Sequence, residues 1–255
     1  MLVTFDECYD NAHNYLILGA LIVPDHKKLH AELLKVKRDY GYTRRDGAAK
    51  EIKYTLCIDK LHYMVATGAV DCFMDSSASF RAIVIDQRES SGFTLDYFGR
   101  PDESRAMKEA RAYKKFTELL LKSNVTIIKN SLLLTDRLTR CKGDTFSSLI
   151  TELFCTPGAY YSSGQKEPIF RHVQEIDTAL EQYQIGQIGD ILQGVILNEL
   201  VPTRNRWKRR LAKYVVGKLG ADSLLPDYWA PLPKWKQDVI HAKYQIWYWK
   251  PGDRP

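Results

Sequence analysis

Short apolar segments alternate with longer segments of helical periodicity along this chain, and this alternation limits the possible folds more than any other feature. Two apolar runs, at 2–7 and 15–23, flank a turn-rich stretch and predict an antiparallel hairpin. Further strands are predicted over 80–86 and 169–176, and residues 125–136 are predicted to form a strand or an entry loop followed by a strand. Helices are predicted over about 25–40, 57–69, 102–122, 144–154 and 184–200. A hairpin followed by alternating strands and helices predicts an α/β protein, with a mixed sheet of about five strands flanked by helices.

The length of the chain and its changes in composition predict two regions. With 255 residues and 45% hydrophobic content, the chain is long enough for one large domain with a full core or for a domain with appendages. We predict a main domain over 1–202, with a helical insertion at about 25–75. Residues 203–255 are predicted to form a basic, Trp-rich C-terminal extension, whose tail contains Trp229, Trp235, Trp247 and Trp249.

Cysteine usage and hydropathy predict a cytoplasmic protein. The five cysteines are scattered and odd in number, which indicates reduced thiols and not a disulfide framework or a zinc site. The charged pair Asp6 and Glu7 comes too early for a signal peptide, and no run approaches the ~20 apolar residues of a membrane span. We therefore expect a soluble intracellular protein with no membrane partner.

Four carboxylates occur where an apolar segment ends or inside one: Asp6, Glu51, Asp136 and Asp190. An ionised Asp in apolar surroundings is costly unless it is paired or bound to a metal ion. Hard cations such as Mg²⁺ and Mn²⁺ prefer oxygen ligands, and two-metal phosphoryl transfer needs several carboxylates at one site. Although a lone Asp at a strand end is usually a turn former, four acids from distant segments predict a shared metal site.

At these acids the chain resembles a known family, the domain of unknown function 3800. The opening TFDECYD and the following LGALIVP resemble that family's first two strands, with Cys8 in place of the usual Ser. EIKY at 51–54 is similar to its Glu-x-Lys element, and LLLTDR at 132–137 to its internal strand ending in Asp. The segment 173–194 resembles its closing pattern, with Gln187, Asp190 and Gly194 at the matching positions. The resemblance implies a ribonuclease H-like fold and a metal-dependent nuclease, often encoded near mobile elements or phage defence genes.

The fourth metal ligand is open at the level of sequence. Glu51 matches the family motif, but its segment looks like an insertion in a ribonuclease H-like topology. Glu109, on the helix after the third strand, and Asp86, at the end of that strand, are the alternatives. Glu7 is expected to point to the opposite face of the sheet from Asp6, because successive strand residues alternate.

A run of basic residues without any acid begins after Pro202. Such runs bind phosphate backbones with little sequence preference, although an amphipathic helix with solvated charges has the same pattern. Trp207 within the run is a candidate for stacking on unpaired bases, and the Trp-rich tail for contact with a partner protein or a second copy. The residues predicted to bind nucleic acid are Lys53, Arg204, Arg206, Lys208, Arg209, Arg210 and Lys213.

These observations predict a nuclease that hydrolyses DNA or RNA with two Mg²⁺ or Mn²⁺ ions held by Asp6, Glu51, Asp136 and Asp190. The alternative is a non-catalytic ribonuclease H-like module that binds nucleic acid or protein within a larger system. A weaker alternative is a metal-dependent nucleotidase. The chain has no Gly-rich phosphate loop, G-x-S-x-G motif or dinucleotide fingerprint, so nucleotide cofactors and serine hydrolysis find no support.

Overall fold

The computed structural model describes residues 1–136, 169–225 and 232–251, with the side chain of Asp136 not described. The helix predicted over 144–154 therefore lies outside the described residues. The strands are β1 (Leu2–Tyr9), β2 (Tyr15–Val23), β3 (Ser79–Asp86), β4 (Ser131–Asp136), β5 (Phe170–Ile176) and β6 (Tyr244–Trp249). The helices are α1 (His26–Asp39), α2 (Lys60–Asp75), α3 (Arg105–Lys122), α4 (Val125–Ile128), α6 (Gln187–Leu200), α7 (Arg206–Lys218) and α9 (Lys234–Lys243).

One mixed sheet contains all six of these strands, in the order β5-β4-β1-β2-β3-β6. β2 pairs antiparallel with both β1 and β3, whereas the β1–β4, β4–β5 and β3–β6 pairs are parallel. The α/β class and the mixed sheet flanked by helices are thus confirmed. The sheet has one strand more than predicted, and this strand comes from the Trp-rich C-terminal segment.

Element boundaries follow local capping signals. Asp25 and Asp59 begin α1 and α2 by accepting main-chain N–H hydrogen bonds, so that the segment between β2 and β3 is helical as predicted. Of the stretch 125–136, only 131–136 form a strand; the entry to it was predicted as strand or loop, but 125–128 form a short helix. The Asn124 carbonyl accepts hydrogen bonds from the N–H groups of residues 127 and 128, and Asn130, at φ 61°, then turns the chain into β4.

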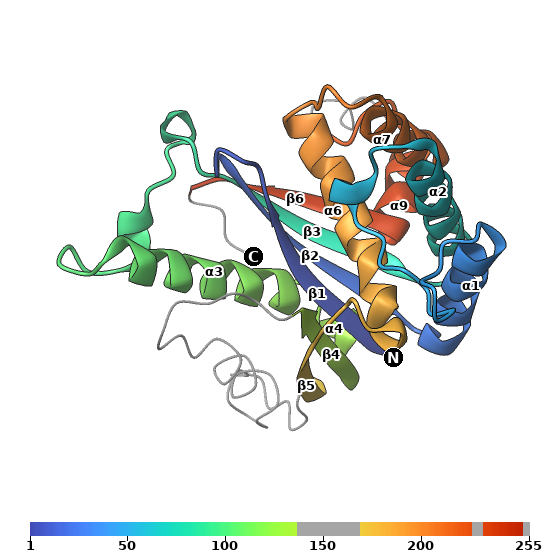
Figure 1. Ribbon diagram of the computed structural model, residues 1–255. Coiled ribbons are helices and arrows are strands. Elements are labelled where there is room, and N and C mark those ends of the chain that lie inside the picture. The colour runs from blue at the N-terminus through green and yellow to red at the C-terminus, as the bar shows by residue number, and fades with distance from the viewer. Residues whose placement is uncertain (137–168, 226–231, 252–255) are drawn as a thin grey trace.

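Both faces of the sheet are covered. Helices α1, α2, α6 and α7 pack over one face, and α3 packs over the other (Figure 1). All nine residues of β2 are buried, as expected for a strand between two helical layers. We refer to the two sides as the α6 face and the α3 face.

Five strands run in the same direction, since only β2 is antiparallel to its neighbours. Their carboxyl ends therefore meet at one end of the sheet, where α/β proteins commonly bind ligands. In the part of the chain that the structure describes, no helix is long and apolar enough to span a membrane.

Lys37, in the last turn of α1, is fully buried at 0% exposure. Burial lowers its pKa from 10.5 to about 7, and Glu51 and Glu181 act in the opposite direction. Between pH 7 and 10.5 the unfolded chain binds more protons than the folded chain, so the unfolding free energy should rise with pH. The rise is at most about 1.4 kcal/mol per pH unit. Urea unfolding of the parent and of Lys37→Met at several pH values checks this. The variant should lack this rise in unfolding free energy with pH, and an identical pH dependence in both proteins would contradict the prediction.

Candidate functional site

Asp6 and Asp136 occupy neighbouring parallel strands, with Asp6 three residues before the end of β1 and Asp136 at the end of β4. The register pairs Phe5 with Thr135, so that Asp6 and the backbone of Asp136 follow side by side. Leu2 and Cys8 pack on the α6 face, and Val3 and Phe5 on the α3 face, which places the half-buried Asp6 on the α6 face. Parallel pairing thus brings together two acids that are 130 residues apart in the sequence.

Asp190 lies on α6 directly above this part of β1. Gln193, one turn further along α6, donates from Nε2 to the main-chain oxygen of Asp6 at 2.8 Å. Gly19, the partner of Asp6 in β2, makes room for this side chain, since a Cβ there would lie 2.7 Å from Gln193 Nε2. Residues three apart share a helix face. The turn that carries Asp190 is therefore held over Asp6.

The Cys8 thiol shares the surroundings of both acids. Its burial and the nearby carboxylates of Asp190 and Asp6 raise the pKa of Cys8 to about 12. A thiol with this pKa stays protonated at neutral pH, and a protonated thiol is a poor metal ligand. The carboxylate oxygens of Asp6 and Asp190 are the donors at this site that suit hard cations.

The segment Glu51–Tyr54 is docked along α6 by three positions of that helix, Gln187, Asp190 and Gly194. Gln187 Oε1 accepts from the Ile52 N–H at 2.9 Å, and Asp190 Oδ2 accepts from the Tyr54 N–H at 2.6 Å. Gly194 faces the Tyr54 ring, where an added Cβ would lie 2.0 Å from Tyr54 Cγ. Positions i, i+3 and i+7 of one helix thus hold an insertion that is about 135 residues away in the sequence.

Glu51 is half-buried beside a lysine and a threonine. Its Oε1 lies 3.0 Å from Lys53 Nζ and accepts from the Thr178 hydroxyl at 3.4 Å. Thr178 follows β5 and packs near Gly186, which itself lies close to Thr4 on the α6 face of β1. Among the side chains that the structure describes, which exclude Asp136, no three His, Cys, Asp or Glu residues lie close enough to hold a metal ion.

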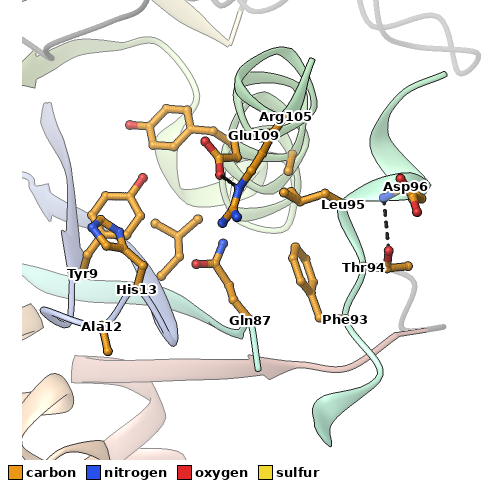
Figure 2. A pocket seen from close by; sticks show the side chains of 13 residues that line it. Tyr9, Ala12, His13, Gln87, Phe93, Thr94, Leu95, Asp96, Arg105 and Glu109 are labelled. Atoms are coloured by element: carbon orange, nitrogen blue, oxygen red, sulfur yellow. Dashed lines mark hydrogen bonds and ion pairs between the residues drawn. The ribbon is translucent and has the colours of Figure 1, made fainter. Parts of the chain in front are cut away.

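Glu109 lies on the opposite side of the sheet. Figure 2 shows it paired with Arg105, at 2.7 Å, beside a cleft of about 870 Å³ that Tyr9 and Phe93 also line. This cleft belongs to the α3 face. Glu7 points the same way, as predicted, and accepts a hydrogen bond from the Tyr113 hydroxyl at 2.8 Å.

Asp86 ends β3 but is already paired with a neighbour. Both of its carboxylate oxygens accept from the Arg88 guanidinium, at 2.9 and 2.6 Å. Two strands also separate β3 from β4 in the sheet. Of the three candidates for the fourth acid, Glu51 is therefore the one that shares the α6 face with Asp6 and Asp190.

The basic run forms α7, which packs against α2 and α6. Lys208 places its ammonium 5.4 Å from the centre of the Tyr54 ring, so this helix begins beside the docked segment. The members of the predicted set that keep solvent exposure are Arg204, Arg206, Arg209, Arg210 and Lys213. Their exposure is compatible with binding to phosphates, and equally with solvated charges.

The tryptophans have mainly structural contacts where the structure describes them. Trp207 packs against Tyr63 with ring centres 5.5 Å apart, which does not favour the predicted stacking on bases. Trp249 packs against Phe116 at 4.9 Å and fastens β6 to α3. Trp235 remains 69% exposed on α9, and Trp229 lies outside the described residues.

The sequence offered little signal for several residues that build the site. Gln193, Tyr54 and Lys37 act through main-chain hydrogen bonds or ring packing with distant segments. Only membership in the EIKY motif marked Tyr54, and nothing in the sequence marked the other two.

The fold and the site together define an α/β protein that carries acidic side chains on one sheet face near the carboxyl ends of parallel strands. No protein-family model, no curated protein and no solved structure matches the chain.

Proposed function

We propose that this protein is a metal-dependent nuclease with a ribonuclease H-like fold, as its resemblance to the domain of unknown function 3800 implies. The observation that carries the proposal is the gathering of Asp6, Asp190 and the Glu51 segment on one sheet face, next to the backbone of Asp136. The antiparallel β1–β2–β3 meander, with β4 and β5 parallel on the other side of β1, is the arrangement expected of a ribonuclease H-like sheet and supports the fold.

Asp6, Asp136, Asp190 and Glu51 would hold Mg²⁺ or Mn²⁺, most simply as two ions. The donor set fits, because Asp6, Glu51 and Asp190 are half-buried carboxylates, whose oxygens suit hard cations. When bound, the ions would supply an activated water and stabilise the departing 3′ oxygen. Lys53, which pairs with Glu51, would contact a phosphate of the substrate.

The proposal is tested by incubating the protein with labelled single-stranded and double-stranded DNA, RNA and a hybrid. Cleavage is expected with Mg²⁺ or Mn²⁺ and should stop when EDTA is added, leaving 5′-phosphate and 3′-hydroxyl ends. Calorimetry with Mn²⁺ should show binding to the free protein. Nucleic-acid binding without cleavage and without Mn²⁺ binding would instead support the non-catalytic alternative.

The exposed face of α7 is proposed to contact the phosphate backbone. Each phosphate contact contributes about 0.7–0.9 to the slope of log K against log salt concentration. Arg209→Ala and Lys213→Ala should therefore weaken binding to all sequences alike and lower the slope by about one each. Fluorescence anisotropy at several salt concentrations measures this.

Lys218→Ala is the matched control for α7. This exposed lysine of the same helix is already paired with Asp71 at 2.7 Å. Its replacement should leave the salt slope unchanged. Equal effects at all three positions would show only a general charge effect, and no effect at Arg209 and Lys213 would remove α7 from the binding surface.

A further inference from the structure

The main chain that carries Glu51 has almost no secondary structure of its own. Between α1 and the short helical turn Tyr54–Leu56, the described structure has only an isolated bridge that pairs Thr43 with Ala49. Neither a strand ladder nor a helix therefore determines where Glu51 lies. Instead, a main-chain hydrogen bond from the Lys50 N–H to the Tyr42 carbonyl, at 3.0 Å, and side chains of this segment and of other elements hold it in place.

Three consecutive residues around Glu51 are held by such side chains. Lys37 Nζ donates to the Lys50 carbonyl at 3.0 Å, and the Tyr42 hydroxyl donates to the Glu51 carbonyl at 3.0 Å. Gln187 accepts from the Ile52 N–H. A hydrogen bond thus fixes the main chain before, at and after the acid.

Lys37 is the centre of this arrangement. Its Nζ also donates to Gln184 Oε1 and to Gln187 Oε1, each at 2.6 Å. The same amine therefore joins α1, the segment at Lys50 and the beginning of α6. These three acceptors are neutral, and among the described residues no carboxylate forms an ion pair with this amine, although Glu51 and Glu181 partly offset its burial from a greater distance. A methionine of similar volume would avoid the cost of burying it.

We propose that Lys37 is a positioning residue, which with Gln187 and Tyr42 places Glu51 at the metal site. The inference rests on the proposed function, because it assigns a role within that site. The hydrogen bonds of the Lys37 amine go to Lys50, Gln184 and Gln187, and not to the carboxylates of the proposed metal site. Its effect on metal affinity is transmitted through the main chain of residues 50–52. In metalloproteins generally, groups that hydrogen-bond to a ligand orient it in the same way.

The first test is Mn²⁺ calorimetry on the parent and on Lys37→Met. The variant should bind Mn²⁺ about 10–100-fold more weakly, the usual effect of removing a partner that orients a ligand. Lys243→Met is the matched control, because Lys243 also has a pKa lowered by burial, to about 8, and donates to a loop carbonyl, that of Ser76 at 2.7 Å. This control should keep the parent's Mn²⁺ affinity.

The second test needs neither metal nor activity. Hydrogen exchange at the Ile52 amide should be at least about tenfold faster in Lys37→Met than in the parent, because the segment loses its anchor. Tyr42→Phe removes a single hydroxyl and should fold even if Lys37→Met does not. It should also weaken Mn²⁺ binding, by about several-fold, as expected for the loss of one hydrogen bond.

The outcomes separate this inference from the proposed function. If the parent binds Mn²⁺ and both variants bind it equally well, with an Ile52 amide protected as in the parent, the positioning role of Lys37 is overturned while the nuclease proposal stands. If the parent binds no Mn²⁺, both are overturned. Weakened Mn²⁺ binding and faster exchange, with an unchanged Lys243→Met control, support the role.

Discussion

Asp6→Asn and Asp190→Asn are each expected to reduce metal-dependent cleavage by more than about 100-fold. Asparagine keeps the shape of the side chain but removes its negative charge and one oxygen donor, and hard cations depend on both. In Asp190→Asn the amide oxygen can still accept from the Tyr54 N–H, so that the docked segment should stay in place. Cleavage rates with Mn²⁺, together with Mn²⁺ affinity, measure the effect.

Glu7→Gln is the control for this experiment. Glu7 is next to Asp6 in β1, yet its carboxylate lies on the α3 face and accepts from the Tyr113 hydroxyl. Glutamine can accept the same hydrogen bond, and cleavage should stay near the parent level. If Asp6→Asn cuts as fast as the parent, the acids are not the catalytic site. If Glu7→Gln is as inactive as Asp6→Asn, the assignment of faces is wrong.

Gly194→Ala is expected to lower the unfolding free energy by about 1–3 kcal/mol, the usual cost of overpacking a core. The new Cβ would lie 2.0 Å from Tyr54 Cγ, so the ring must move, and the segment that carries Glu51 must move with it. Cleavage and Mn²⁺ affinity should therefore fall together with stability. Urea unfolding and calorimetry on the same preparations measure both effects.

Gly189→Ala on the same helix provides the contrast. Its Cβ would meet Leu21 Cβ at 3.9 Å, an ordinary contact, and alanine is the better helix former by about 0.8–1.0 kcal/mol. It should leave the protein as stable as the parent or more so. In a Tyr54→Ala background, Gly194→Ala should cost little more, because the ring that it displaces is absent. A full cost in that background would show that Tyr54 is not the obstacle.

Much of the sheet was predictable, because its signals are local. The runs at 2–7, 15–23, 80–86 and 169–176 became β1, β2, β3 and β5 with small changes at their ends. The alternation along β1 correctly separated Asp6 from Glu7. The pairing of β6 with β3 was not predictable, because it joins residues about 160 positions apart that carry no matching local signal.

The site was predictable as a set of acids but not as an arrangement. The sequence favoured Glu51 through its motif and kept Asp86 and Glu109 as alternatives, and the fold separates the three in space. Glu109 lies across the sheet, Asp86 is paired with Arg88, and Glu51 shares the α6 face with Asp190. Nor does any local pattern indicate that Lys37 would be fully buried, since a lysine on an amphipathic helix is normally solvated.

By itself, the sequence determined the α/β class, most of the strands and the acids that end or interrupt its apolar segments. These properties depend on periodicity and on capping residues, which act over a few positions. The tertiary structure alone decided that Glu51 and Asp190 share a face of the sheet with Asp6 and how residues 49–54 are held. Those outcomes depend on hydrogen bonds and ring contacts between segments about 135 residues apart, such as Gln187 with Ile52 and Gly194 with Tyr54.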